Sequence, residues 1–132
     1  MLNNIDVLNN FQNLKVIDAT NCYIEEVNLN LPKLEDLNLS NNFLKAYPVL
    51  ANMSKLKTLN LNSNKLADLK SMKVEFTQAL VSINIGNNPT LQFSSTRDFM
   101  DFLKKISNLR MKSLDIDLDC VKEFDGISIF LK

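Results

Sequence analysis

Apolar residues recur at fixed intervals along most of the chain. Residues 34–42 (LEDLNLSNN) and 56–64 (LKTLNLNSN) share one order, in which leucines at the first, fourth and sixth places precede an asparagine at the ninth. Looser copies occupy 14–22, 80–88 and 111–119. Apolar and polar residues alternate within each copy, which is typical of a strand with one buried face. Self-similarity of this kind predicts a solenoid in which short strands stack in parallel.

The segments that follow the copies also agree with one another. An aliphatic residue comes two places after the ninth position, as Ile24, Leu44, Leu66 and Val121. Ile5, Leu8 and Phe11 fit the same kind of tail after Asn3. We predict that the chain turns at the ninth position and returns along the outer side of the coil.

The ninth position of the repeat is asparagine in the central copies, as Asn42, Asn64 and Asn88. We predict that these side chains are buried and bind backbone groups of the turn that would otherwise lack hydrogen-bond partners. Cys22 takes this place in the first copy. We interpret Cys22 as a small buried substitute and not as a nucleophile, because buried structural cysteines are chemically inert.

One return segment is longer than the others. About 22 residues separate Asn42 from Asn64, whereas the interval that ends at Asp119 is much longer. This interval contains a sequence similar to a capping box at 95–98. Apolar residues follow it at helical spacing, as Phe99, Phe102, Leu103 and Ile106. We predict an amphipathic helix over Thr96–Ser107, with its apolar stripe on the outer side of the solenoid.

The repeated motif of 34–42 and 56–64 resembles that of intracellular leucine-rich-repeat proteins, over nearly the whole chain. The resemblance implies an α/β fold, namely a curved solenoid with a parallel sheet on its concave face. We expect a single domain over 1–132 with about five repeats. The central repeats look like the short class of phosphatase-regulatory, spliceosomal and dynein-associated members, and the interval with the helix looks like the ribonuclease-inhibitor class.

The two ends of the array differ from its middle. No recognisable polar cap precedes the first copy, so its strand is expected to have an open hydrogen-bonding edge. At the other end an apolar run comprises Phe124, Ile127, Ile129, Phe130 and Leu131. This run is either a compact cap or the start of an interrupted repeat. We favour a C-terminal cap over 120–132.

The side chains between the strand leucines are predicted to face the concave surface. They are short, polar and mildly acidic, and the candidate partner-binding residues are Asp18, Thr20, Asp36, Asn38, Ser40, Asn60, Asn62, Asn84, Asp115 and Asp117. Amides and hydroxyls suit a peptide, helix or loop, and the carboxylates favour a basic partner. The alternative is an ordinary solvated strand surface, since this face has no aromatic or arginine anchor.

Composition excludes several classes of function. Lys plus Arg and Asp plus Glu number 15 each, which argues against nucleic acid or an anionic membrane as the partner. Histidine is absent, so catalytic triads and imidazole-bound zinc are excluded. The run 115–119 resembles the start of a calcium loop, but Cys120 and Gly126 stand where that loop needs glycine and glutamate. We expect no enzyme activity, no cofactor and no metal.

Two functions of different kinds remain open. The first is an adaptor that binds another protein through the concave face, of which a phosphatase regulator is a narrower version disfavoured by the missing concave aromatic residues. The second is a structural subunit that packs into a larger assembly through its open ends or convex side. Two cysteines and no apolar leader favour the cytoplasm, with the nucleus as the alternative. The identity of the partner and the oligomeric state do not follow from the sequence.

Overall fold

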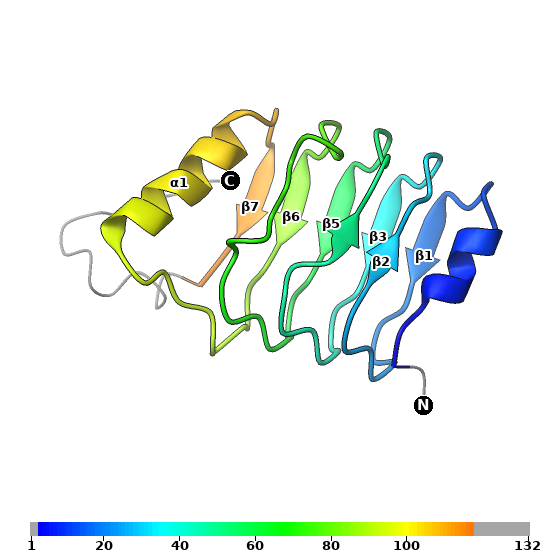
Figure 1. Cartoon of the computed structure of the whole chain (residues 1–132), viewed down its shortest axis with the longest axis horizontal. Coiled ribbons are helices and arrows are strands. Elements are labelled where there is room, and N and C mark those ends of the chain that lie inside the picture. The colour runs from blue at the N-terminus through cyan, green and yellow to red at the C-terminus, as the bar shows by residue number, and fades with distance from the viewer. Residues whose placement is uncertain (1–2, 118–132) are drawn as a thin grey trace.

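The computed structural model describes residues 3–117 as a curved solenoid whose coils stack side by side (Figure 1). A short 3-10 helix, η1 (Asp6–Asn10), precedes the first full coil. The remaining elements in chain order are β1 (Val16–Asp18), β2 (Asn28–Leu29), β3 (Asp36–Asn38), β4 (Val49–Leu50), β5 (Thr58–Asn60), β6 (Ser82–Asn84), α1 (Thr96–Ser107) and β7 (Ser113–Asp115).

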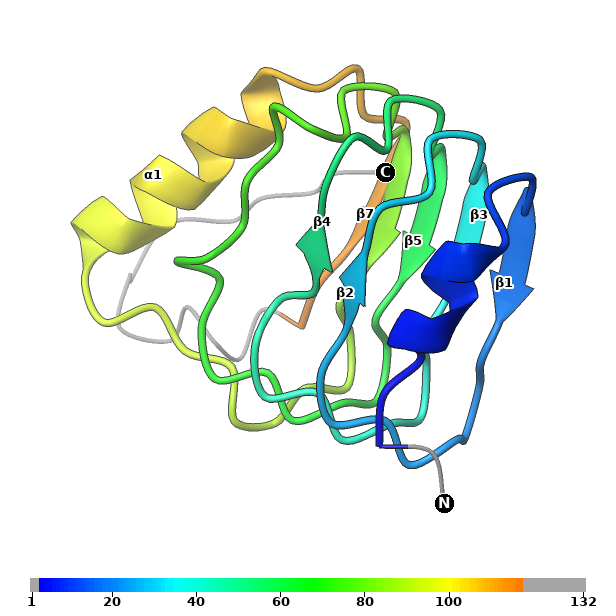
Figure 2. The same cartoon turned by 45° about the vertical axis from the view of Figure 1, so that its right-hand side comes forward.

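One sheet forms the inner side of the solenoid. Its strands pair in the order β1-β3-β5-β6-β7, and every pairing is parallel. Each strand lies in one of the five sequence copies, and the middle residue of each strand aligns with that of the next, as Ile17 with Leu37 and Leu37 with Leu59. The predicted α/β solenoid with a parallel sheet on its concave face is confirmed. A smaller parallel pair, β2 and β4, lies on the opposite side of the coils (Figure 2).

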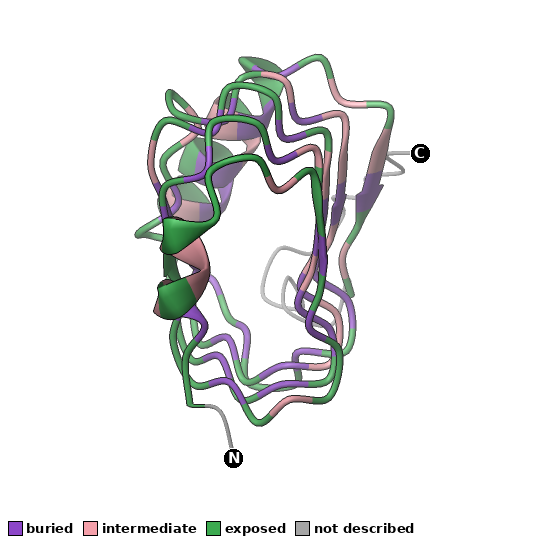
Figure 3. Ribbon diagram, turned by 90° about the vertical axis from the view of Figure 1, so that its right-hand side faces the viewer, coloured by how far each residue is buried: buried purple, intermediate pink, exposed green. Residues whose placement is uncertain are grey.

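The leucines of the repeat fill the interior. Leu34, Leu37 and Leu39 are fully buried in the second coil, and Leu56, Leu59 and Leu61 take the same places in the third. Figure 3 looks along the solenoid and shows buried and exposed positions alternating around every coil. Burying one such side chain contributes about 1.5–3 kcal/mol, so stacking the coils supplies most of the stabilisation.

The asparagine column bonds neighbouring coils to one another. The Asn42 Oδ1 atom accepts hydrogen bonds from the backbone N–H groups of Cys22 and Ile24. Its Nδ2 atom donates to the carbonyl oxygens of Ala19 and Leu39. Asn64 and Asn88 are also buried and bind backbone groups in the same manner. The column is therefore structural, as predicted.

Cys22 differs from that prediction. Its side chain is half-buried, with Sγ 3.4 Å from the carbonyl oxygen of Thr20. The cysteine lies in the first full coil, and among the described residues no complete coil stacks on its outer side. The expectation of a buried cysteine is therefore met only in part, because burial in this column comes from the neighbouring coils.

The predicted helix over Thr96–Ser107 is confirmed as α1. Ser95 caps it, because its Oγ accepts a hydrogen bond of 3.1 Å from the backbone N–H of Asp98. Phe99, Phe102 and Ile106 are buried, which places the apolar stripe against the solenoid. The Phe93 ring meets Phe99 edge-on at 5.1 Å between ring centroids.

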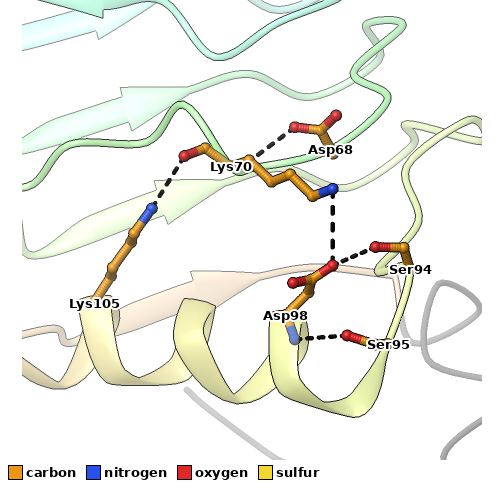
Figure 4. Close-up of polar contacts among 6 residues, drawn as sticks. All are labelled: Asp68, Lys70, Ser94, Ser95, Asp98 and Lys105. Atoms are coloured by element: carbon orange, nitrogen blue, oxygen red, sulfur yellow. Dashed lines mark hydrogen bonds and ion pairs between the residues drawn. The ribbon is translucent and has the colours of Figure 1, made fainter.

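Polar contacts also hold α1 to the preceding coil (Figure 4). The Lys105 Nζ donates to the carbonyl oxygen of Lys70 at 3.2 Å. The Lys70 Nζ lies 3.8 Å from Asp98 Oδ2, which also accepts a hydrogen bond from the Ser94 hydroxyl. These groups are at the surface, so packing of the phenylalanines carries the attachment and the polar contacts orient the helix.

The ends of the array agree only partly with expectation. β1 lies at the edge of the sheet, and no other described strand pairs with its outer side. The outer half of the first coil is covered by η1, however, so the expectation that nothing caps this end is wrong for that half. The proposed cap over 120–132 lies outside the described residues and stays a prediction.

Candidate functional site

The inner sheet is hollowed into a shallow depression of about 320 Å³. Six of the candidate residues line it, namely Asp18, Asp36, Asn38, Asn60, Asn84 and Asp115. They come from all five strands of the inner sheet. The other candidates, Thr20, Ser40, Asn62 and Asp117, are in the column after the strands and do not line this depression.

The central column of the depression has a structural role that the sequence analysis did not foresee. The Asn38 Oδ1 accepts the backbone N–H of Ser40 at 3.0 Å, and the Asn60 Oδ1 accepts that of Asn62 at 2.9 Å. The same bond recurs from Thr20 to Asp18 and from Gly86 to Asn84. These are Asx turns, in which a side-chain oxygen binds the backbone N–H two residues later.

The Asx turns prepare the tight bend after each strand. The next residue in each coil adopts a left-handed backbone with φ between 52° and 59°, at Asn21, Asn41, Ser63 and Asn87. Asparagine tolerates this region better than most residues, which explains its frequency beside the buried column. The sequence contains a signal for these turns, namely an Asp or Asn three places before each of these left-handed residues.

The Asx turns also fix which way the asparagine amides point. A backbone N–H can only donate, so the side-chain oxygen must face the turn and the NH₂ group must face away from it. The Nδ2 atoms of Asn38, Asn60 and Asn84 make no hydrogen bond with the described residues. Adjacent parallel strands are about 4.8 Å apart, so these three amides form a row of evenly spaced donors.

Carboxylates stand at both ends of this row. The hydroxyl of Thr20, and then its backbone N–H, donate to Asp18 and lower the pKa of that carboxyl below its ordinary value. The Thr58 hydroxyl donates to Asp36 at 2.6 Å. Asp115 is exposed on β7. The face therefore presents amide donors at its centre and negative charge at both margins.

The neighbouring column is bonded within itself. The Asn62 Nδ2 donates to Asn84 Oδ1 at 3.1 Å, and Asp117 Oδ2 accepts the backbone N–H of Asn87 at 2.7 Å. A Cβ atom on Gly86 would lie 3.1 Å from Asn62 Nδ2, so glycine permits this close approach. Asn62 and Asp117 therefore hold the turns in place and have less capacity for a partner than the central row.

An exposed aromatic pair was missed by the sequence analysis. The rings of Tyr23 and Phe43 are 5.9 Å apart between centroids, and the two residues are 50% and 43% exposed. They directly follow the buried column in the first two coils, where the third and fourth coils have Lys65 and Pro89. The sequence signal was an aromatic residue at the same place in two successive copies.

Other kinds of site find no support within residues 3–117. A groove of about 440 Å³ runs beside α1, with Leu69, Phe93 and Phe102 together with lysine and aspartate side chains in its walls. No group of three or more acidic, cysteine or histidine side chains in the described part could hold a metal ion. No described helix has the length and apolar character needed to cross a membrane.

Comparison with known proteins agrees with the geometry. Residues 32–73 match the family described as Leucine Rich repeats (2 copies). No curated protein and no solved structure matches the chain. The stacked coils and the matched repeats together define the fold as a leucine-rich-repeat solenoid. Domains of this kind commonly mediate protein–protein interactions and are generally non-catalytic.

Proposed function

We propose that this chain is a non-catalytic adaptor that binds another protein through its concave face. The observation that carries the proposal is the row of outward-facing amide donors on Asn38, Asn60 and Asn84. Polar groups that are already satisfied within a fold add little to recognition, whereas these donors are preorganised and exposed to a partner. The row lies in a depression, which gives a partner contacts from several strands at once.

The side chains of the depression indicate which chemical groups a partner should carry. Amide donors require acceptors such as carbonyl or carboxylate oxygens opposite the centre, and Asp18 and Asp115 favour basic groups opposite the margins. Four strand spacings separate these two carboxylates, a path of roughly 19 Å. A helix of about 13 residues or an extended segment of about six residues covers that distance.

The first test is purification of the tagged chain from its own cells at moderate salt, followed by mass spectrometry and cross-link mapping. The adaptor proposal expects one stoichiometric partner, with cross-links from lysines that flank the sheet, such as Lys15, Lys57 and Lys112. Asp115→Lys should then weaken the complex, because it reverses charge at one margin. Asp117→Lys is a poorer choice, since it would also disturb the turn at Asn87.

A matched pair of substitutions at Asn60 separates recognition from folding. Asn60→Asp keeps an oxygen for the backbone N–H of Asn62 but removes the donor, whereas Asn60→Ala removes both. Asp18 already makes the same turn with a carboxylate, so Asn60→Asp should fold normally. With the purified partner we expect about tenfold weaker binding, from a lost hydrogen bond and a carboxylate facing an acceptor. Unchanged affinity would exclude the amide row of Asn38, Asn60 and Asn84 as the partner-binding site.

A structural subunit remains the second candidate. The open edge of β1 and the exposed pair Tyr23 and Phe43 favour it, because both lie toward one end of the array. In this case the purified material would be a large complex, and cross-links would map to the first coil or to α1. Cross-links confined to the depression would count against a structural subunit.

The cellular setting and subclass belong to the same proposal. Support for a cytoplasmic adaptor comes from Cys22, which is a free thiol in the described residues. Support for the short repeat class comes from the outer returns of the first coils, which contain β2 and β4 in place of helices. Fluorescent tagging tests the first point, and exclusive secretion of the tagged chain would refute it.

A further inference from the structure

In the first coil, side chains form hydrogen bonds with the outer edge of β2, whereas no described strand pairs with the outer edge of β1. On the outer side, the Asn9 side chain binds the backbone of β2 and of the residue after it. It donates to the Asn28 carbonyl at 3.0 Å and accepts from the Asn30 N–H at 2.8 Å. Asp6 accepts the Asn28 N–H at 3.2 Å, and Gln12 donates to the Asn30 carbonyl at 3.2 Å. Side chains around η1 therefore replace a neighbouring strand and close the edge of β2.

On the inner side of the coil, no described side chain takes the place of a strand beside β1. Within the sheet, alternate residues of each strand form backbone hydrogen bonds with the preceding coil. In β3 the Asp36 N–H donates to Lys15, and the Asn38 carbonyl accepts from the Ala19 N–H. The equivalent groups of β1 are the Val16 N–H and the Asp18 carbonyl, and no described strand pairs with them. Such an edge is a ready site for an added strand.

The side chains beside this edge define the chemistry of an added strand. Val16 is 61% exposed and Asp18 is also exposed on the concave face, two residues apart. Asp36 lies directly across from Val16 in the register of β1 and β3. An added strand would therefore present an apolar residue beside Val16 and, two residues later, a basic residue beside Asp18.

We propose that the open edge of β1 binds an extended segment of a partner protein in parallel, with a lysine or arginine beside Asp18. The exposed carboxylate of Asp18 provides the charge complementarity, and the backbone of β1 provides the hydrogen bonds. This site goes beyond the concave-face proposal, because it depends on backbone groups at one edge and not on the amide row. The two sites share Asp18, so that residue cannot distinguish them.

The solenoid itself supplies a probe. An added strand would stand to β1 as β1 stands to β3, so a peptide copying residues 15–21 has the correct backbone pattern. The probe is this peptide, acetylated and amidated, carrying Asp18→Lys, and the control is the unsubstituted copy. The full-length chain labelled with ¹⁵N is titrated with each peptide to millimolar concentration. We expect the Val16 and Asp18 amide resonances to shift, with at least about threefold weaker binding of the control.

Two substitutions in the chain test the backbone contact. Val16→Pro removes the outward N–H at an edge position where proline is tolerated, whereas Val16→Thr keeps it. We expect the first to raise the peptide Kd at least about tenfold and the second to leave it within about twofold. Asn60→Asp should leave peptide binding unchanged, which separates failure of this site from failure of the amide row.

Several results would overturn the proposal. Equal binding to the Val16→Pro and Val16→Thr proteins would show that the edge is not used. Shifts centred on Asn60 and Asn84 would place the peptide in the depression. Shifts of Val16 that depend on protein concentration without peptide would show that a second copy occupies the edge. If Val16→Pro fails to fold, hydrogen exchange decides the question, since bound peptide should protect the Val16 and Asp18 amides of the unaltered chain.

Discussion

Removing the Asn64 side chain should be one of the most damaging single changes in the chain. Asn64 is 2% exposed, and its Oδ1 accepts the backbone N–H of Leu44 at 3.0 Å. Its Nδ2 donates to the carbonyl oxygens of Leu39 and Leu61, each at 3.0 Å. Asn64→Ala leaves these groups without their partner in a dry interior, where one unsatisfied group costs about 1–3 kcal/mol. Allowing for relaxation, we expect a loss of about 3–5 kcal/mol of unfolding free energy.

Asn60→Ala is the control for this prediction, because it removes the same side chain four residues earlier in the same coil. Asn60 is half-exposed, and its Oδ1 accepts one backbone hydrogen bond. We expect a loss of about 0.5–1.5 kcal/mol. The assay is urea unfolding followed by circular dichroism, with a check that the dependence on urea is unchanged. Equal losses for the two variants would refute the structural role of the buried column.

Three further predictions concern the turns and the helix. Gly86→Ala should break the hydrogen bond between Asn62 and Asn84 and lower the unfolding free energy by about 1 kcal/mol, measured in urea. Thr20→Val should raise the pKa of Asp18 toward 3.8 in an NMR titration. Because the folded pKa is lowered, the stabilisation from Asp18 is present above about pH 4 and is lost as the pH falls through the folded value. Phe99→Ala should cost about 3–5 kcal/mol, with loss of helical circular dichroism.

The inner sheet and the helix could be predicted because their signals are strong and local. Leucines at fixed spacing mark each strand, and the cap at Ser95 and the stripe from Phe99 to Ile106 mark the helix. The outer strands could not be predicted in the same way. β2 and β4 have two residues each, which is too short for any alternation to appear. Their positions are set by the coils that they connect.

The candidate site was predicted only in part, for a different physical reason. Alternation correctly placed Asn38 and Asn60 in the depression, but it says nothing about hydrogen bonds across the turn. Which face a side chain occupies is a property of one strand. Whether its polar atoms are already bonded depends on the following turn and on the next coil, as for Asn62 and Asn84.

The choice between aspartate and asparagine in the central column is informative about function. The turn needs only a side-chain oxygen, and Asp18 and Asn38 supply it equally well. Folding therefore does not constrain the second polar atom of the side chain, which is an oxygen in aspartate and an NH₂ group in asparagine. The choice between them at each position can therefore depend on the partner. The order from β1 to β7 is Asp18, Asn38, Asn60, Asn84 and Asp115. Amides at the centre and carboxylates at both margins are thus the part of this surface that the fold does not explain, and the part that binding experiments should vary first.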